Sequence, residues 1–355
     1  MLKAYFRKHI LHFKQPGGTS RGILTTKDTW FIVCFDDDEP ETKGIGECSI
    51  LRGLSIDDCP DFETKLQHVC DDIENWQYWL KDGLIEFPAI RFGLETAIKD
   101  ILEGGERLLF HSSFTIGDDY IPINGLVWMG DYQTMRNRII EKIDAGYNCV
   151  KLKIGAINFE DELKLLHLIR KYFSERDMEL RLDANGAFSP TEAIEKLKRL
   201  SEFKIHSIEQ PIKQNQWEEM ADVCSGSPIP IALDEELIGI ENREKLSELL
   251  DIIKPQFIIL KPSLLGGFRQ SSIFIQEAEN HNIGWWITSA LEANIGLNAI
   301  AQWTYTLNNI LPQGLGTGQV FINNIKSPLA INKGYLYYDP MEKWDLKGII
   351  DGNHV

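Results

Sequence analysis

The chain has 355 residues, of which 43% are hydrophobic and 25% are charged, an ordinary composition for a globular protein. This length favours two domains, although an α/β barrel alone can reach about 250 residues. The formal net charge of −16 argues against a nucleic-acid partner, which would require a basic face.

Cysteine usage and hydropathy indicate the cellular compartment. The six cysteines are scattered and form no Cys-x-x-Cys pair, which favours reduced thiols. The start of the chain lacks the uninterrupted apolar core of a signal peptide. No run approaches the roughly 18 apolar residues of a membrane span, so we expect a cytoplasmic protein without membrane insertion.

The first part of the chain has the composition of strands followed by helices. It predicts strands at residues 3–13, 29–35 and 43–50. Helices are expected at residues 57–81 and 89–102, the second ended by Gly104 and Gly105. Strands followed by helices indicate a separate α+β unit.

From residue 121 onward, strands, loops and helices alternate. A typical helix, behind an Asn158 cap, has apolar residues at steps of three and four between Phe159 and Tyr172. Eight strands with intervening helices are typical of a βα-barrel with right-handed crossovers. The expected strands are residues 121–125, 149–154, 179–183, 205–209, 229–234, 257–261, 284–288 and a short eighth at 311–316.

The last part of the chain returns to β-type composition. Residues 329–331 and 335–338 flank a turn and are expected to pack on the first unit. We therefore predict an α+β domain at residues 1–115, completed by residues 320–355, and a barrel domain at residues 116–319.

Five charged residues each end a short apolar run of the predicted barrel. They are Lys153, Asp183, Glu209, Asp234 and Lys261. Their spacing of roughly 25–30 residues is that of one strand, one helix and two loops. Because all strands of a βα-barrel end at the same rim, these residues are expected to converge on one pocket.

The three acidic members of this set predict a metal site. Mg²⁺ prefers oxygen ligands and leaves positions open for water or substrate. A metal held by Asp183, Glu209 and Asp234 would polarise a substrate carboxylate and stabilise an enediolate. One such carboxylate alone is more often a helix cap or a loop residue, but three in register favour the metal.

The lysines predict acid–base chemistry. Lys151 and Lys153 share one face of their strand, whereas Leu152 points toward the helices. Crowding of ammonium groups beside a divalent cation lowers a lysine pKa toward the value that a general base requires. An exposed edge strand is the alternative for this pair. Lys261 lies across the expected pocket, as a second acid/base or as a cation facing a delocalised intermediate.

Other candidate site features carry weaker signals. Arg181 shares a strand face with Asp183, and supports the site or forms an ion pair elsewhere. Backbone N–H groups of residues 314–318 offer an anion site without P-loop spacing. Residues 17–21 are a glycine-rich loop that folds over the barrel mouth as a lid or forms a simple hairpin turn. Residues 36–39 are acidic but typical of a solvated turn.

The ordered five-residue set resembles the enolase superfamily, in particular its muconate-lactonising subgroup. The Lys-x-Lys pair of that subgroup matches Lys151 and Lys153, its metal ligands match the three carboxylates, and its opposing lysine matches Lys261. The resemblance covers nearly the whole chain. It implies a modified (β/α)7β TIM-like barrel with an α+β capping domain, a Mg²⁺ cofactor with Mn²⁺ as a possible substitute, and a small-molecule carboxylate substrate.

Within the subgroup, the motifs most resemble the o-succinylbenzoate synthases of menaquinone biosynthesis. The supporting motifs are Gly-Ile-Gly-Glu-Cys-Ser at 44–49, Leu-Arg-Leu-Asp-Ala-Asn-Gly at 180–186, Ser-Ala-Leu-Glu at 289–292 and Gly-Leu-Gly-Thr-Gly at 314–318. The resemblance implies a syn dehydration in which Lys153 removes the proton alpha to the carboxylate and then protonates the departing hydroxyl. Lys261 would stabilise the intermediate, and Lys151 would tune Lys153.

The same resemblance implies where the substrate binds. The succinyl tail would lie between the loop 17–21 and the ends of the seventh and eighth strands. The residues expected to bind substrate are Arg181, Ser20, Ser289, Glu292, Gly316 and Thr317.

Three alternatives remain open. N-Acylamino-acid racemases and dipeptide epimerases share the proton abstraction, although the epimerases usually carry Asp-x-Asp at the eighth strand, where this chain has Gly316-Thr317-Gly318. A non-catalytic metal-binding protein is disfavoured by the intact five-residue set. Relatives with a histidine base are disfavoured by Lys261. The oligomeric state is left undetermined.

Overall fold

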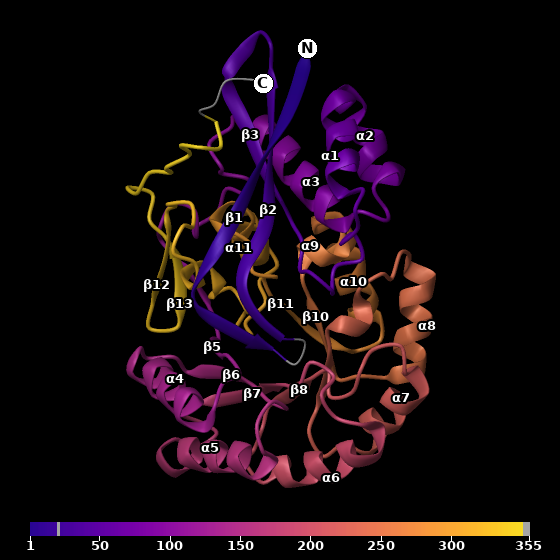
Figure 1. The fold of residues 1–355 in the computed structure, drawn as a ribbon, viewed down its shortest axis with the longest axis vertical. Coiled ribbons are helices and arrows are strands. Elements are labelled where there is room, and N and C mark those ends of the chain that lie inside the picture. The colour runs from indigo at the N-terminus through magenta and orange to yellow at the C-terminus, as the bar shows by residue number, and fades with distance from the viewer. Residues whose placement is uncertain (20–21, 351–355) are drawn as a thin grey trace.

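The computed structural model of the chain describes residues 1–19 and 22–350. Its N-terminal unit contains an antiparallel sheet in the order β1-β2-β3, formed by β1 (Leu2–Thr19), β2 (Gly22–Asp36) and β3 (Glu39–Ser49). The β1–β2 hairpin is long and reaches from this unit to the barrel mouth (Figure 1). The three strands were predicted, but both hairpin strands extend further than expected.

Helices cover one face of this sheet. They are α1 (Phe62–Asp71), η1 (Ile73–Asn75), α2 (Trp76–Tyr78), η2 (Trp79–Gly83) and α3 (Pro88–Leu102). The prediction of one helix over 57–81 is wrong. The Asp72 carboxylate accepts hydrogen bonds from Asn75 Nδ2 at 2.6 Å and from Trp79 Nε1 at 3.1 Å, and such local side-chain bonds compete with regular helix.

Helix α3 packs unusually close to β3. A Cβ on Gly44 would lie 2.1 Å from the carbonyl oxygen of Ala97, and one on Gly46 would lie 1.8 Å from that of Gly93. Only glycine permits this approach, which explains the two glycines of the 44–49 motif. The close packing holds the next residue, Glu47, at the contact between the N-terminal unit and the barrel.

The barrel sheet is parallel, in the order β11-β10-β9-β8-β7-β6-β5. Its strands are β5 (Gly125–Val127), β6 (Cys149–Lys153), β7 (Glu179–Asp183), β8 (Ser207–Glu209), β9 (Ile231–Leu233), β10 (Phe257–Leu260) and β11 (Gly284–Ile287). Helices lie on the outside of this curved sheet (Figure 1). The fold class, a modified (β/α)7β barrel with an α+β unit, is therefore confirmed.

Seven longer helices follow the barrel strands. They are α4 (Tyr132–Asp144), α5 (Phe159–Tyr172), α6 (Pro190–Ser201), α7 (Trp217–Gly226), α8 (Arg243–Ile253), α10 (Phe268–Asn280) and α11 (Asn294–Thr306). Three short turns lie at the rim: η3 (Glu235–Leu237), α9 (Pro262–Leu265) and η4 (Thr317–Val320). Of the helices within the described residues, none combines the length and apolar character needed to cross a membrane.

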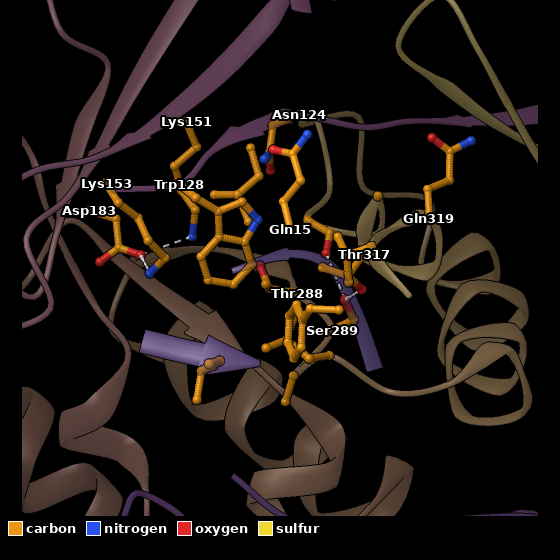
Figure 2. A pocket seen from close by; sticks show the side chains of 18 of the residues that line it. Gln15, Asn124, Trp128, Lys151, Lys153, Asp183, Thr288, Ser289, Thr317 and Gln319 are labelled. Carbon is orange, nitrogen blue, oxygen red and sulfur yellow. Dashed lines mark hydrogen bonds and ion pairs between the residues drawn. The ribbon is translucent and has the colours of Figure 1, made fainter. Parts of the chain in front are cut away.

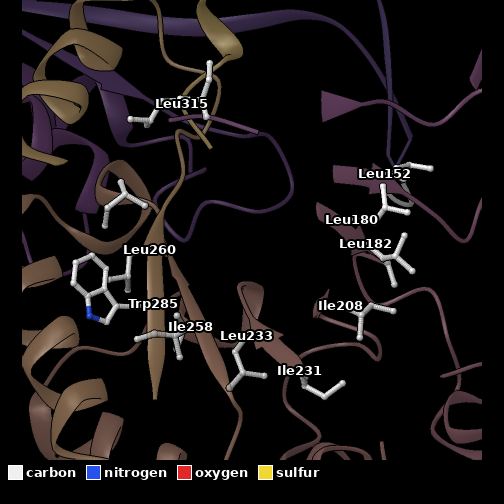
Figure 3. Packing of buried hydrophobic residues seen from close by; sticks show 14 of the residues in the cluster. Leu152, Leu180, Leu182, Ile208, Ile231, Leu233, Ile258, Leu260, Trp285 and Leu315 are labelled. Carbon is white, nitrogen blue, oxygen red and sulfur yellow. The ribbon is translucent and has the colours of Figure 1, made fainter. Parts of the chain in front are cut away.

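Alternation along the strands separates the core from the site. Figure 3 shows apolar strand side chains, among them Leu152, Leu182 and Ile208, in the cluster between sheet and helices. The intervening residues face the barrel interior, since side chains alternate along a strand. Polar groups at these inward positions are thereby directed to one axis.

Two strand predictions of the barrel are wrong. Residues 121–125 are not the first barrel strand, because β4 (Tyr120–Pro122) pairs antiparallel with β13 (Tyr335–Tyr338), beside β12 (Leu329–Asn332). Pro122 lacks an N–H donor and fits this edge position. The first barrel strand is β5 instead.

No regular eighth strand forms at 311–316 within the described residues. Gln313 and Gly314 make single parallel bridges to Ile123 and Thr288, and so link the two ends of the sheet. The Gln313 side chain replaces part of the ladder, because its Oε1 accepts the Ile287 N–H at 2.7 Å. The preceding Pro312 has no N–H to donate.

The tail contacts both parts of the chain. Its hairpin pairs with β4, whereas Phe321 and Ile325 pack with Leu11, Phe31 and other residues of the first sheet. The domain limits at 115 and 320 stay a prediction.

Candidate active site

A cavity of about 450 Å³ opens at the barrel mouth, below the β1–β2 hairpin. Lys151, Lys153, Asp183 and Lys261 line it from the strand ends, and Figure 2 shows the first three of them. Glu209 is the last residue of β8, and Asp234 directly follows β9; both are buried beside these lysines. The structure thus brings together the five residues singled out by their spacing, together with Lys151.

Strand register places the catalytic candidates side by side. Lys153 pairs with Asp183 across β6 and β7, and Asp183 pairs with Glu209 across β7 and β8. Lys151 and Lys153 share the inward face, and Leu152 packs outward in the core, as predicted. The alternative of an exposed edge strand is wrong, because β6 lies inside the sheet and all its residues are buried.

The lysines and carboxylates form one buried network of ion pairs. Lys153 Nζ donates to Asp183 Oδ2 at 2.6 Å, and Lys151 Nζ donates to Glu209 Oε2 at 2.6 Å. Lys261 Nζ donates to Asp234 Oδ2 and lies 3.9 Å from Glu209 Oε1. Three lysines and three carboxylates therefore pair with each other at the base of the cavity, where the carboxylates are buried.

Electrostatics in this network follow from the pairing. Burial disfavours the charge of Asp183, but Lys153 and Lys151 outweigh burial and lower the pKa of Asp183. Burial also opposes the charge of Lys261, yet Asp234 and Glu209 raise its pKa on balance. The pKa of Lys151 is raised as well, because attraction to Glu209 and Asp183 exceeds the effect of burial.

An asparagine that sequence analysis missed holds Lys153 from a second side. Asn185 Oδ1 accepts a hydrogen bond from Lys153 Nζ at 2.6 Å, and Asn185 Nδ2 donates to Glu235 Oε1 at 2.9 Å. Asn185 has a left-handed backbone with φ 44°, which asparagine tolerates better than most residues. It belongs to the 180–186 motif, so the signal was present in the sequence.

The three carboxylates have the chemistry of a metal site. No three His, Cys, Asp or Glu side chains of the described residues surround one point as metal ligands, because the three carboxylates face lysines. However, Glu209 Oε1 is buried and has no hydrogen-bond partner within the described residues. This unsatisfied oxygen and an all-carboxylate donor set fit a Mg²⁺ ion.

Three of the predicted substrate-binding residues line the cavity. They are Ser289, Gly316 and Thr317, and Figure 2 shows Ser289 and Thr317 across the cavity from Lys153. The hydroxyls of Ser289 and Thr317 lie 2.5 Å apart, and Ser289 Oγ also donates to the carbonyl of Gly314 at 3.2 Å. These residues offer hydroxyl and backbone groups as hydrogen-bond partners for a polar group of the substrate.

Two predicted substrate-binding residues lie elsewhere. Arg181 precedes Asp183 by two residues and therefore lies one layer deeper in the barrel. Its guanidinium lies 4.3 Å from the centroid of the Trp286 ring, and its Nε donates a hydrogen bond to Glu179 Oε1 at 2.7 Å. Glu292 is buried, accepts hydrogen bonds from Ser263 Oγ and from the Ala290 N–H of the barrel, and lies within reach of the charges of Lys27 and Glu47 in the N-terminal unit. Neither Arg181 nor Glu292 lines the cavity.

Ser20, the remaining predicted substrate-binding residue, lies outside the described residues. The described end of the hairpin does line the cavity, through Phe13, Leu24 and their neighbours. Trp128 and Asn124 also line it, and sequence analysis missed them because a single polar or aromatic residue near a short strand carries no pattern.

Comparison with known proteins identifies the family. A family model described as enolase C-terminal domain-like matches residues 134–339. The chain is 47% identical to the o-succinylbenzoate synthase of Desulfotalea psychrophila (strain LSv54 / DSM 12343) over 365 aligned positions, covering 93% of this chain and 97% of that protein. The crystal structure of MenC from Desulfotalea psychrophila LSv54 matches with a TM-score of 0.84 and 44% identity, covering 95% of this chain and 99% of that chain.

A more distant structure shares the fold. The dipeptide epimerase from Enterococcus faecalis V583, complexed with Mg and a dipeptide, matches with a TM-score of 0.82 and 18% identity over 95% of this chain and 97% of that chain. The family model spans more than half of the sequence, and the Desulfotalea relative is similar along almost all of it. The chain therefore belongs to the enolase superfamily, in the family of the o-succinylbenzoate synthases.

Proposed function

We propose that the chain is a hydro-lyase that converts 2-succinyl-6-hydroxy-2,4-cyclohexadiene-1-carboxylate to o-succinylbenzoate, in menaquinone biosynthesis. The observation that carries the proposal is the convergence of Lys153, Lys261 and the three carboxylates at one cavity, in a chain of this family. A cavity of about 450 Å³ suits a substrate of one ring and one short chain.

Lys153 acts as the base and then as the acid. Its Nζ, held by Asp183 and Asn185, takes the proton from the ring carbon alpha to the carboxylate. The electron pair of that C–H bond then forms the ring double bond as the neighbouring C–O bond breaks. The ammonium of Lys153 returns the proton to the departing hydroxide, so that water leaves and the ring becomes aromatic. One residue serves both steps because the elimination is syn.

Lys261 and Lys151 act through their charge. The raised pKa of Lys261 favours a permanent ammonium that faces the negative charge developing on the substrate. Lys151 lies between Asp183 and Glu209, 2.6 Å from the latter, and raises the local positive potential around Lys153.

Asp183, Glu209 and Asp234 would hold Mg²⁺, with Mn²⁺ as a possible substitute. When bound, Mg²⁺ supplies positive charge for the substrate carboxylate and so stabilises the anion that proton removal leaves. The succinyl tail lies between the described end of the hairpin and the hydroxyls of Ser289 and Thr317. The partner is thus a small carboxylate, and we infer no nucleic-acid partner. We place the enzyme in the cytoplasm, in keeping with its six free cysteines.

The test is dehydration by purified protein with Mg²⁺, with and without a chelator. We expect turnover that the chelator removes and added Mg²⁺ restores. The racemase alternative is tested by solvent deuterium incorporation into N-succinyl amino acids, which we expect to be slow or absent. Rapid deuterium incorporation without any dehydration would show that the protein is a racemase rather than a synthase. A dipeptide epimerase is disfavoured by Gly316-Thr317-Gly318, which offers no carboxylate for a substrate ammonium.

A further inference from the structure

The β1–β2 hairpin docks on the segment that follows β5. Gly18 and Met129 form an antiparallel bridge, in which the Met129 N–H donates to the Gly18 carbonyl at 3.3 Å. A Cβ on Gly18 would lie 2.6 Å from the Met129 carbonyl oxygen, so a larger residue would displace the hairpin. From α4, Arg138 Nη1 donates to the carbonyls of Trp128 at 3.1 Å and Met129 at 2.9 Å. Residues 128–129 are therefore held both by the hairpin and by Arg138.

The Trp128 ring lies between this docked hairpin and Lys153. A Cβ on Gly17 would lie 3.3 Å from the ring, and the Phe13 ring meets it edge-on with centroids 6.3 Å apart. On the cavity side, Lys153 Nζ lies 5.8 Å from the indole centroid. Figure 2 shows the ring in the cavity, near the ends of Lys151 and Lys153. One side chain thus contacts both the cover of the site and the proposed base.

We propose that Trp128 is a positioning residue that couples docking of the hairpin to the placement of Lys153. The inference rests on the proposed function. The face of an indole attracts an ammonium, and its area excludes water from the space beside Nζ. Phe13 and Gly17 determine where the ring can lie, so undocking of the hairpin frees the ring and opens the base to water.

Lys153 has hydrogen-bond partners in addition to its contact with the Trp128 ring. Asp183, the last residue of β7, and Asn185 each accept a hydrogen bond from its Nζ at 2.6 Å. The described hairpin residues reach the base through Trp128, which touches Phe13, Gly17 and Lys153. Loss of the Trp128 ring therefore does more than remove packing, because it breaks the connection between the hairpin and Lys153.

The experiment compares Trp128→Leu, Trp128→Phe, Gly18→Ala and the double variant Gly18→Ala/Trp128→Leu. Trp217→Leu is the matched control, since Trp217 packs on the barrel core with Lys245 Nζ 5.5 Å from its ring centroid but does not line the cavity. We expect Trp128→Leu to lower kcat by about 10- to 100-fold with a smaller change in KM, since a small misplacement of a reacting group costs this much. Trp128→Phe, which keeps an aromatic face, recovers most of the loss.

Gly18→Ala is expected to cause a similar loss, and the double variant to be no worse than either single one, because both break the same connection. Hydrogen exchange of the Met129 amide gives a readout that needs no substrate: it rises in Trp128→Leu and stays at the wild-type level in Trp217→Leu. Trp128→Leu with normal kcat, a fall in kcat without faster Met129 exchange, or additive losses in the double variant would each overturn the coupling. If the wild-type protein does not dehydrate the substrate, the proposed function fails, and Met129 exchange still decides whether the ring holds the hairpin.

Discussion

Asp183 Oδ2 accepts a hydrogen bond from Lys153 Nζ at 2.6 Å, between residues that are in register on adjacent parallel strands. Each is the last residue of its strand, so the contact depends only on register and on the shared rim. The same relation continues to Glu209, the last residue of β8. The proton-transfer group and the proposed metal ligands are therefore placed by rigid strands rather than by loops, which favours precise geometry.

Replacement of the base tests the central assignment. We expect Lys153→Ala to lower kcat by about 10²- to 10⁴-fold, the usual contribution of general acid–base catalysis, because the variant lacks the amine that Asp183 and Asn185 hold at the cavity. The measurement is steady-state dehydration with saturating Mg²⁺. Lys164→Ala is the control, since the Lys164 side chain is 65% exposed and pairs with Asp161 on the surface. Full turnover by Lys153→Ala would show that another group removes the proton.

The metal site is tested through Glu209. Glu209→Gln removes a negative charge and one carboxylate oxygen, so we expect Mg²⁺ affinity, measured by calorimetry, to weaken by more than about tenfold. Dehydration by the variant should require correspondingly more Mg²⁺. Asp161→Asn is the matched control, on the outer helix α5. Wild-type Mg²⁺ affinity in Glu209→Gln would exclude Glu209 as a ligand.

Sequence alone predicted the residues whose direction is determined by strand alternation. Lys153, Asp183 and Glu209 end apolar strands, and parallel strands end at one rim, so local pattern and topology together place them. Arg181 shows the limit of this reasoning. Arg181 lies on the predicted face of its strand but deeper in the barrel than the cavity. Its guanidinium donates a hydrogen bond to the Pro312 carbonyl at 2.8 Å.

Features that depend on contacts distant in sequence could not be predicted. Glu292 belongs to the same motif as Ser289, but it is buried close to Lys27 and Glu47 of the N-terminal unit, and no sequence pattern reports that arrangement. The eighth strand is reduced to two bridges because Pro312 and the Gln313 side chain interrupt its ladder. Trp128 acquires a role only where a hairpin from the start of the chain reaches it.

The contact between the N-terminal unit and the barrel is tested through Glu47. Its Oε1 accepts the Ala293 N–H at 2.7 Å, and its Oε2 accepts the Gly296 N–H at 2.8 Å, at the positive end of α11. Glu47→Gln replaces one acceptor with a donor, so we expect the free energy of unfolding to fall by about 1–3 kcal/mol. Urea denaturation measures it.

Glu106→Gln serves as the control for Glu47→Gln, because the Glu106 side chain is 75% exposed. This variant should unfold within about 0.5 kcal/mol of wild type, as surface substitutions usually do. If Glu47→Gln also changes the free energy of unfolding by less than about 0.5 kcal/mol, the Glu47 carboxylate does not hold the two parts of the chain together.

The pH dependence of stability is tested through Asp57, which lies apart from the active site in the N-terminal unit. Burial raises its pKa from 3.8 to about 7, although the carboxylate accepts the Ala89 N–H at 2.8 Å. The folded protein thus binds this proton more tightly than the unfolded chain does. The resulting stability is fully present below pH 3.8 and is lost as the pH rises through about 7. The pKa difference corresponds to at most about 4 kcal/mol.

Asp57→Asn removes this titration, so the unfolding free energy of the variant minus that of wild type should increase between pH 4 and pH 8 and level off above it. Thermal or urea unfolding at several pH values measures the difference, in which the titrations common to both proteins cancel. The adjacent Asp58→Asn is the control: the backbone N–H of Gly53 and the Arg52 guanidinium outweigh burial and lower the pKa of Asp58. Its contribution is therefore lost only at lower pH, and this variant should show no such increase. A flat difference for Asp57→Asn would mean that the buried carboxyl keeps an ordinary pKa.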